Sequence, residues 1–489
     1  MSLPETKFFK WLSPLVHLSS NLLSRIGVVL VTAATVFWIW LLPTIVRGDI
    51  RHPYVGLLTF VALPGVFFTG LALIPAGIIL RRRREHHRGV FPASFPPLDL
   101  QNVELRRLLI FVGIITAVNV MIGGQLTYSS MNYVDSVTFC GQTCHTVMQP
   151  EFTAYQSSPH SRVECVQCHI GPGASWFVRS KLSGTYQVYA VAFNKFPRPI
   201  PTPVHNLRPA RETCEQCHWP QRFVGDRLKI IPKFGDDEKN SLTKTVLMLH
   251  IGGGPSSPGI HSAHLGAGIT IQYGSDESRQ NIHWVEYQNT RTGKTAMFLD
   301  SDTKPGAVNR SAARTMDCID CHNRPTHIYY LPDRAMDQAM ATGEISASLP
   351  FVKKQGLDIL KQSYATQAEA GAKIPVALSE YYRKNYPDVY RQQSADVVQA
   401  GNALVAIYDR NVFPEMKVLW GTYPNNIGHT DFPGCFRCHD GAHSTSDASQ
   451  NIPQDCSTCH NLLAADDPNP KILVDLGIAP ETTEAARKK

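Results

Sequence analysis

The sequence has no cysteine outside six short motifs, although its 489 residues include 12 cysteines. Every cysteine belongs to a pair that a histidine follows directly, and this pattern excludes a disulfide framework. No DNA- or RNA-binding motif is present, and the basic residues gather in one Arg-rich segment, so nucleic acid is not an expected partner. No fixed period is present beyond the motif itself, which excludes a solenoid.

The six motifs have the attachment pattern of c-type haem, in which two thiols bind the porphyrin and the histidine becomes an axial ligand. A single motif would also suit a zinc site or a redox pair. Six motifs that use all 12 cysteines predict six covalently bound haem c groups. The attachment residues are Cys140, Cys144, Cys165, Cys168, Cys214, Cys217, Cys318, Cys321, Cys435, Cys438, Cys456 and Cys459. The proximal ligands are His145, His169, His218, His322, His439 and His460.

Further histidines are the candidate distal ligands, because low-spin haem iron takes two strong axial ligands. The candidates are His160, His205, His261, His264, His327, His429 and His443. Most of them lie close to a motif in the sequence, and the 261/264 spacing suits one or two ligands on a single helical turn. His250 and His283 lie in predicted strands, where we expect structural roles.

Histidine is absent from the interior of three long apolar runs near the N-terminus. The runs cover 26–46, 55–80 and 108–128, and each reaches the length of about 20 residues that a bilayer requires. Without interior histidines, they provide no ligands for a b-type haem between membrane helices. No small-residue cleavage site follows the first run, which argues against a cleaved signal peptide. The sequence therefore predicts three transmembrane helices.

Basic residues predict how these helices are oriented. The loop between the second and third runs holds Arg81 to Arg84, Arg88, Arg106 and Arg107, whereas the preceding loop has only Arg47 and Arg51. Positively charged loops stay in the cytoplasm. We therefore expect a bacterial inner-membrane protein with a cytoplasmic N-terminus and periplasmic haem domains, on the side where c-type haem is attached.

Composition divides the chain into four expected parts. Residues 1–130 form a membrane anchor, and 131–225 form a haem domain with three haems. Short alternating runs separated by Gly, Asp, Asn and Ser predict a β-rich insertion over 226–300. Residues 301–489 form a second domain with three haems and, at 331–418, a helical segment. The expected fold class is a mainly α multihaem cytochrome c with three N-terminal transmembrane helices and a small β-rich insertion.

Residues 109–223 resemble the NapC/NirT family of membrane-anchored multihaem quinol dehydrogenases. The shared features are a span followed directly by a haem motif, His160 in a Ser-Pro-His sequence, a second motif and Lys181. The longer arrangement, with three spans and six haems, is similar to the extended inner-membrane quinol-oxidising cytochromes of metal-reducing bacteria. That similarity includes residues 323–327 and 432–443.

The resemblance implies a quinol site beside the first haem. Lys181 matches the lysine of the family's quinol site, whereas Gln187 stands near the family's acidic position and cannot accept a proton. Glu151 is the candidate base, and Asp135 and Tyr155 are local alternatives.

The first iron has two candidate protein ligands. The family uses a methionine just after the motif, and Met148 lies one residue beyond that position. This motif also has three residues between its cysteines instead of two, so His145 and Met148 both stay open, and Met148 is alternatively a packing residue.

The expected function is quinol oxidation at the periplasmic membrane face, with quinol as substrate and electron relay along the haems. The expected partners are membrane lipid, the quinone pool, a periplasmic multihaem cytochrome or reductase, and further membrane subunits. Three alternatives stay open. They are a haem-conduit subunit without its own quinol site, a terminal reductase of nitrite-like or sulfur oxyanion substrates, and the same route run toward the quinone pool.

Overall fold

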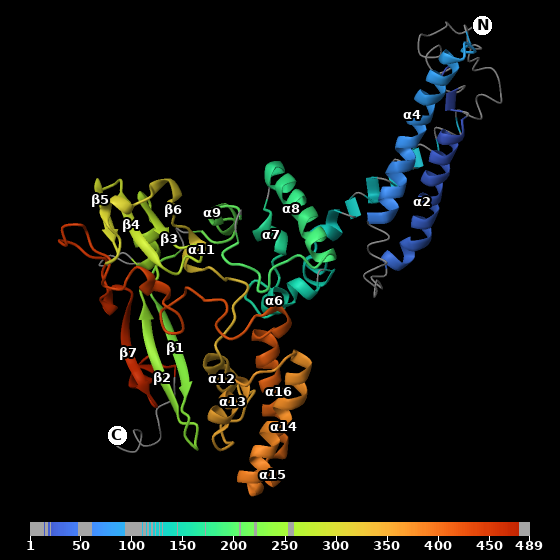
Figure 1. The fold of residues 1–489 in the computed structure, drawn as a ribbon. Coiled ribbons are helices and arrows are strands. Elements are labelled where there is room, and N and C mark those ends of the chain that lie inside the picture. The colour runs from blue at the N-terminus through green and yellow to red at the C-terminus, as the bar shows by residue number, and fades with distance from the viewer. Residues whose placement is uncertain are drawn as a thin grey trace. The chain divides into compact units, whose positions relative to one another are not determined.

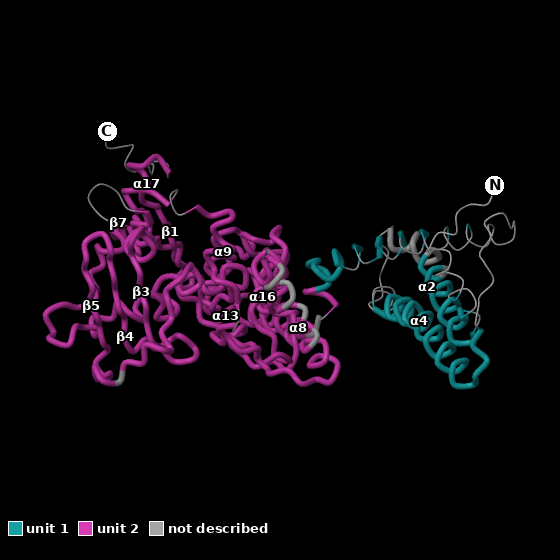
Figure 2. Tube along the Cα trace, turned by 90° about the horizontal axis from the view of Figure 1, so that it is seen from above, with its two compact units in different colours: residues 1–139 teal, residues 140–489 magenta. Residues whose placement is uncertain are grey.

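The computed structural model describes most of the chain in two separate units. The described residues are 14, 18–19, 21–46, 61–92, scattered positions between 110 and 129, 131–143, 145–171, 173–204, 207–219, 223–252 and 259–478. One unit is Met1–Phe139 and the other is Cys140–Lys489 (Figure 2).

The first unit is built on two helices, α2 (Leu22–Val46) and α4 (Leu63–His87), which pack side by side (Figure 1). Gly27 and Gly70 meet where the helices approach each other. A Cβ on Gly27 would lie 2.6 Å from the Gly70 carbonyl oxygen, and a Cβ on Gly70 would lie 2.8 Å from the Gly27 oxygen. Glycine at both positions therefore permits the close backbone approach that is typical of membrane helix pairs.

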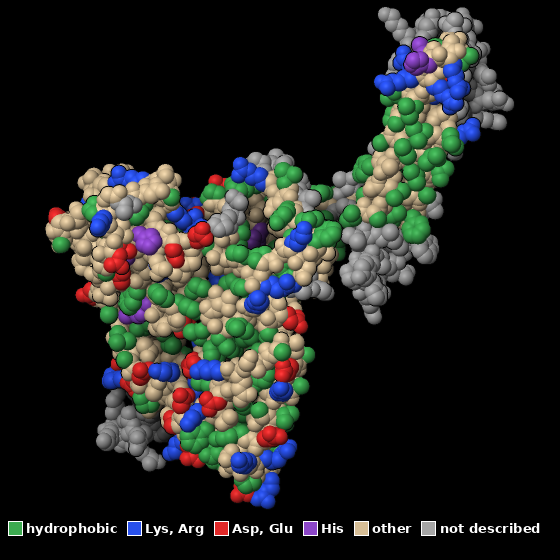
Figure 3. Space-filling view, viewed as in Figure 1, with side chains coloured by type: hydrophobic (Ala, Val, Ile, Leu, Met, Phe, Trp, Pro, Cys, Tyr) green, Lys and Arg blue, Asp and Glu red, His purple; other side chains and the backbone are tan. Residues whose placement is uncertain are grey.

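The face of these helices that Figure 3 shows is largely apolar along its length, and basic residues gather at the end of α4. Its exposed side chains include Leu22, Val29, Phe37, Phe68, Leu71 and Ile79. Within the described residues, α4 is long and apolar enough to cross a membrane, and the shorter apolar stretch of α2 covers Leu22–Thr35. The predicted run at 108–128 lies largely outside the described residues, so three spans remain a prediction.

Short helical turns carry the haem motifs of the second unit, and longer helices connect them. A helical turn brings residues i and i+3 to the same face, which suits a pair of cysteines separated by two residues. The helices of this part are α6 (His145–Gln156), α7 (Cys165–His169), α8 (Ala174–Ala192), α9 (Ala210–Cys214), α10 (Ile260–Leu265), α11 (Cys318–Cys321) and α17 (Lys471–Asp475). The 3-10 turns are η4 (Pro305–Ala307), η5 (Arg310–Ala312), η6 (Pro414–Met416), η7 (Gly434–Arg437) and η8 (Cys456–Thr458).

Two antiparallel sheets follow the first three motifs. The strands are β1 (Arg227–Phe234), β2 (Leu242–Leu249), β3 (Ile269–Ser275), β4 (Ile282–Asn289), β5 (Lys294–Leu299), β6 (Arg314–Thr315) and β7 (His460–Asp467). The sheet orders are β1-β2-β7 and β5-β4-β3-β6. Five strands coincide with the short runs that the sequence predicts within 226–300, but β6 and β7 join from outside that range. The β-rich part is therefore not a self-contained insertion, because the sixth motif runs directly into β7.

A helical bundle occupies the segment that the sequence predicts to be helical. It comprises α12 (Pro332–Ala341), α13 (Val352–Leu360), α14 (Gln367–Asn385), α15 (Pro387–Gln392) and α16 (Ser394–Asn411). Its core includes Met336, Leu378, Tyr382 and Leu404, which are fully buried. The bundle contains no cysteine and no histidine. It therefore has no haem motif of its own, and its stability rests on apolar packing.

Candidate haem ligands and their arrangement

The first motif forms a widened helical turn. The segment Phe139–Thr143 is π-helical, and this motif has three residues between its cysteines. A π-turn accommodates one extra residue within a helix, so it matches the longer spacer. Gly141 packs against the ring of Phe152, and a Cβ at this position would collide with that ring. Cys144 and the side chain of His145 lie outside the described residues.

Each of the other five motif histidines faces a second histidine from a different part of the chain. The pairs, with the distances between their ring centroids, are His160–His218 (5.9 Å), His169–His327 (6.4 Å), His261–His322 (6.2 Å), His264–His439 (5.9 Å) and His429–His460 (6.3 Å).

These spacings fit an ion between two imidazoles. An imidazole nitrogen lies about 2 Å from a metal that it binds, and the ring centre lies about 1 Å further along that line. Two rings on opposite sides of one ion therefore have centres about 6 Å apart. All five pairs match this distance, so the residues present fit iron held by two histidines beside each covalent attachment site.

Hydrogen bonds at Nδ1 favour the same ring orientation. His264 Nδ1 lies 2.7 Å from the Ile260 carbonyl oxygen, and His439 Nδ1 lies 2.6 Å from that of Pro453. A ring that donates from Nδ1 keeps Nε2 available as a metal ligand. The local backbone therefore orients these rings for binding through Nε2.

Neighbouring attachment sites follow one another in chain order. A hydrogen bond from the Cys140 thiol lowers the pKa of Cys165 to about 7, so the first and second motifs are adjacent. Burial and then the charge on Cys214 raise the pKa of Cys168. This interaction between the two cysteines indicates that the third motif lies beside the second. A hydrogen bond with Cys318 lowers the pKa of Cys214 to about 7, so the fourth motif follows the third.

The same order continues to the last motif. Burial and then the charge on Cys435 raise the pKa of Cys321 to about 11, so the fourth and fifth motifs are neighbours in space. Burial and then the charge on Cys435 also raise the pKa of Cys459, so the fifth and sixth motifs are neighbours in space as well. Six sites in an unbroken spatial sequence suit stepwise electron transfer.

Asp320, within the fourth motif, connects this motif to the fifth through its backbone carbonyl oxygen. Asp320 is 3% exposed, and its Oδ1 accepts hydrogen bonds from Tyr273 Oη and Arg314 Nε, both at 2.7 Å. Arg437, in the spacer of the fifth motif, donates to the carbonyl oxygens of Asp320 and Arg279, each at 2.6 Å. The sequence analysis missed this connection, and its only signal was a charged residue within each spacer.

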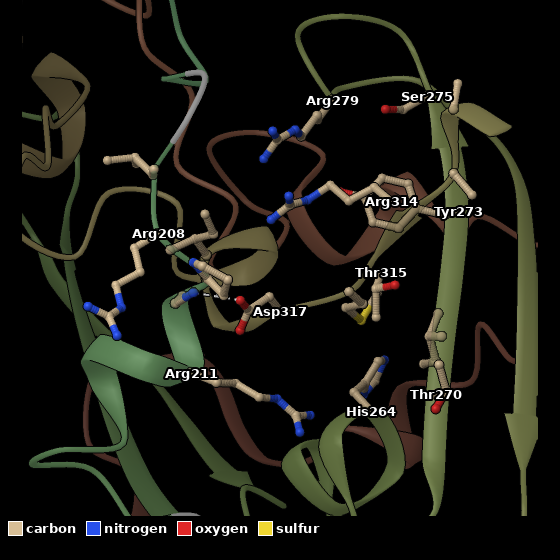
Figure 4. A pocket seen from close by; sticks show the side chains of 18 of the residues that line it. Arg208, Arg211, His264, Thr270, Tyr273, Ser275, Arg279, Arg314, Thr315 and Asp317 are labelled. Atoms are coloured by element: carbon tan, nitrogen blue, oxygen red, sulfur yellow. Dashed lines mark hydrogen bonds between the residues drawn. The ribbon is translucent and has the colours of Figure 1, made fainter. Parts of the chain in front are cut away.

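A cavity of about 750 Å³ lies beside the fourth motif, with Ile319 in its lining (Figure 4). Its lining includes His264 and four arginines, Arg208, Arg211, Arg279 and Arg314, which come from three different segments. Guanidinium groups bind carboxylates in a bidentate manner, so this lining suits a ligand that carries carboxylates.

Comparisons with known proteins identify the family of the chain. Residues 102–199 match the N-terminal region of the NapC/NirT cytochrome c family. The cytochrome c-type protein ImcH of Geobacter sulfurreducens is 41% identical over 470 residues, which cover 95% of this chain and 90% of that protein. This chain belongs to the NapC/NirT cytochrome c family. It is thus a membrane-associated electron-transport cytochrome with covalently bound haem. No solved structure matches the cytochrome.

Helix α8 of the cytochrome carries the residues that the family resemblance relates to quinol. Lys181 lies within it, and its side chain is outside the described residues. Gln187 is exposed and donates to Ser183 Oγ at 3.3 Å. The helix has a strongly exposed apolar stripe that consists of Leu182, Tyr186, Tyr189 and Phe193.

The structure places Glu151 and Met148 in protein contacts. Glu151 Oε1 accepts from Arg324 Nη2 at 3.0 Å, and its Oε2 lies 3.2 Å from His327 Nδ1. Met148 is half-buried and packs against an apolar cluster that includes Val147 and Tyr423. Met148 thus has the surroundings of a packing residue, whereas Glu151 lies beside a candidate iron ligand.

Among the described residues, His443, His250 and His283 form no ring pair with a motif histidine. His443 is 1% exposed, with Nδ1 2.9 Å from Asp440 Oδ1 and Nε2 3.0 Å from the Ile282 carbonyl oxygen. Both ring nitrogens therefore have protein partners, so a structural role fits His443 better than the predicted ligand role. His250 and His283 likewise face Asp226 and Asp300. His205 lies outside the described residues.

Proposed function

We propose that this cytochrome is an inner-membrane hexahaem protein that oxidises quinol, preferably menaquinol, at the periplasmic membrane face. Electrons would then pass along its haems to a periplasmic cytochrome or reductase. The observation that carries the relay is the set of five facing histidine pairs, each with the spacing of two imidazoles on one iron. The membrane topology in this proposal has the N-terminus in the cytoplasm and all six motifs in the periplasm.

In the proposed ligand set, each distal histidine comes from a different part of the chain than the motif that it serves. The distal ligands of the second to sixth motifs are His327, His160, His261, His264 and His429, in that order. The first iron keeps His145 and Met148 as its candidate ligands, and His443 is left out because both of its nitrogens are hydrogen-bonded. Haem c supplies one-electron transfer when it is bound.

The protein's own groups then have three tasks. The histidine pairs fix the orientation of each group, and the Asp320–Arg437 connection holds the fourth and fifth attachment sites together. We further propose that Arg208, Arg211, Arg279 and Arg314 bind haem propionates, because four guanidinium groups line one cavity. Closely held sites with fixed ligands favour electron transfer because little has to rearrange.

Quinol oxidation is proposed for the surface of α8. Leu182, Tyr186 and Phe193 are between 63% and 69% exposed, and an apolar and aromatic stripe suits a membrane interface from which quinol approaches. Lys181 lies on the same helix and is the proposed quinol-site residue. Glu151 is held by Arg324 and His327, so we assign it to ligand support instead of proton acceptance.

Stopped-flow reduction of the purified oxidised protein by a menaquinol analogue tests this proposal. We expect rapid haem reduction in the wild type and its loss in Lys181→Ala, because the variant lacks the proposed quinol contact. Lys195→Ala is the matched control, since Lys195 follows the same helix and contacts Tyr189 Oη at 2.9 Å. Reduction by dithionite but not by the quinol analogue in the wild type would contradict a quinol site on this chain.

A haem-conduit subunit is the second candidate function. The exposed Gln187, which hydrogen-bonds within its own helix, favours it because an amide cannot take up a quinol proton. Under this alternative, a partner subunit handles the quinone, and the stopped-flow reduction would require that subunit.

A further inference from the structure

The ring of His327 faces His169 and comes from the loop after the fourth motif. Its Nδ1 lies 3.0 Å from the backbone carbonyl oxygen of Glu151 and 3.2 Å from the Oε2 atom of the same residue. The backbone carbonyl therefore makes the hydrogen bond to Nδ1, and the buried carboxylate oxygen Oε2, which makes no hydrogen bond within the described residues, lies beside the same nitrogen.

The carboxylate of Glu151 is held firmly in this position. Arg324 donates to its Oε1 at 3.0 Å and, through Nε, to the carbonyl oxygen of His327 at 2.7 Å. The guanidinium of Arg324 also lies over the ring of Tyr423, with 4.1 Å between its Cζ and the ring centroid. Arg324 is 8% exposed, so one buried cation fixes both the carboxylate and the backbone that carries the histidine.

This arrangement sets one histidine pair apart from the other four. His264 and His439 direct Nδ1 to the backbone carbonyls of Ile260 and Pro453, and His160 Nδ1 lies 3.4 Å from that of Pro325. Among the facing histidines, the contacts of the described residues bring a side-chain carboxylate to Nδ1 only at His327.

A carboxylate at Nδ1 has a known chemical effect. Its negative charge stabilises the Nδ1 proton, which makes the imidazole more basic at Nε2. A more basic axial ligand stabilises ferric iron more than ferrous iron, so the reduction potential falls.

We propose that Glu151 is a positioning residue that orients His327 and lowers the reduction potential of the haem attached at Cys165 and Cys168. Arg324 holds the Glu151 carboxylate in place for this purpose. The inference rests on the proposed pairing of His169 with His327. The contact between the Glu151 carboxylate and His327 distinguishes the second haem from the haems of the other described pairs.

The test is a redox titration of the full-length, haem-loaded protein, monitored by electron paramagnetic resonance. In Glu151→Gln, we expect one low-spin signal to become easier to reduce, with a roughly tenfold shift of its ferric/ferrous ratio. A tenfold shift is about 59 mV for a one-electron couple. The other haems should keep their potentials.

Glu164→Gln is the matched control, because Glu164 is an exposed carboxylate directly before Cys165 and no described contact joins it to His327. An equal shift in both variants would overturn the proposal, since any nearby charge would then suffice. No shift in Glu151→Gln would overturn it as well. Glu151→Asp keeps the charge on a shorter side chain, and a potential between those of the wild type and Glu151→Gln would support the proposal.

His327→Ala separates this inference from the proposed ligation. If one low-spin haem becomes high-spin in His327→Ala while Glu151→Gln leaves every potential unchanged, the ligand pairing stands and the role of Glu151 is wrong. If His327→Ala leaves the number of low-spin haems unchanged from the wild type, the pairing itself is wrong and the inference falls with it.

Discussion

The helical bundle and the haem-motif segment at 145–219 are stabilised in different ways. In the bundle, Ile374, Leu378 and Leu404 are completely buried within one large apolar cluster. Among the described residues of 145–219, few apolar side chains are buried, and three of them are the alanines Ala154, Ala190 and Ala210. Hydrocarbon burial therefore defines the bundle, whereas the motif segment is arranged around its attachment sites.

Removal of one attachment site should produce the largest effect and would test the comparison directly. In Cys165→Ser combined with Cys168→Ser, we expect one haem fewer per chain and increased proteolysis within 145–219, because this segment buries few apolar side chains of its own. The bundle should stay protected. Haem quantification and limited proteolysis with mass spectrometry measure both results. Equal protection of 145–219 with and without that haem would contradict the comparison.

Truncation of the bundle core should have the next largest effect. Leu378→Ala removes a fully buried side chain, and such changes cost about 2–5 kcal/mol of unfolding free energy. We expect faster hydrogen exchange in α14 and α16 with unchanged haem potentials. Val376→Ala, on the same helix at 54% exposure, should change stability by less than about 0.5 kcal/mol. A changed haem potential in Leu378→Ala would show that the two regions are coupled.

Substitution of His443 should have the smallest effect on stability. It would also test whether His443 is a structural residue or a haem ligand. His443→Ala leaves the Ile282 carbonyl oxygen and Asp440 without their partner, at a cost of about 1–3 kcal/mol. The five haems with paired histidines should stay low-spin. In His429→Ala, by contrast, one haem should become high-spin, because His429 faces His460 at 6.3 Å. Electron paramagnetic resonance distinguishes the two variants, and a high-spin signal in His443→Ala would return it to the ligand set.

Sequence position alone misleads about which histidines belong together. His160 precedes the second motif by five residues, yet it faces His218 of the third. His327 follows the fourth motif by five residues, yet it faces His169 of the second. Local spacing could identify these residues as candidates, but a chain that folds back on itself decides their partners. Closeness to a motif in the sequence is not enough to identify a ligand. His443 is also close to a motif, yet both of its ring nitrogens have hydrogen-bond partners.

In the β-rich part, too, local sequence predicts the strands, whereas the fold decides which strands pair. Alternating apolar residues predict β1 to β5, because strand periodicity is a local property. The addition of β7 beside β2 joins residues more than 200 positions apart, as in the pairing of Leu249 with His460. Only the folded backbone selects such a partner, since many exposed strand edges could accept it.

The sequence by itself determined the attachment chemistry, the apolar runs and the family, because each depends on residue type and short-range spacing. Its cysteines and following histidines predict haem c wherever the chain places them. The tertiary structure alone decided the histidine pairs, the spatial order of the motifs and the contact of Glu151 with His327. These depend on distances between segments far apart in the chain, and packing and hydrogen bonding across the whole fold set those distances.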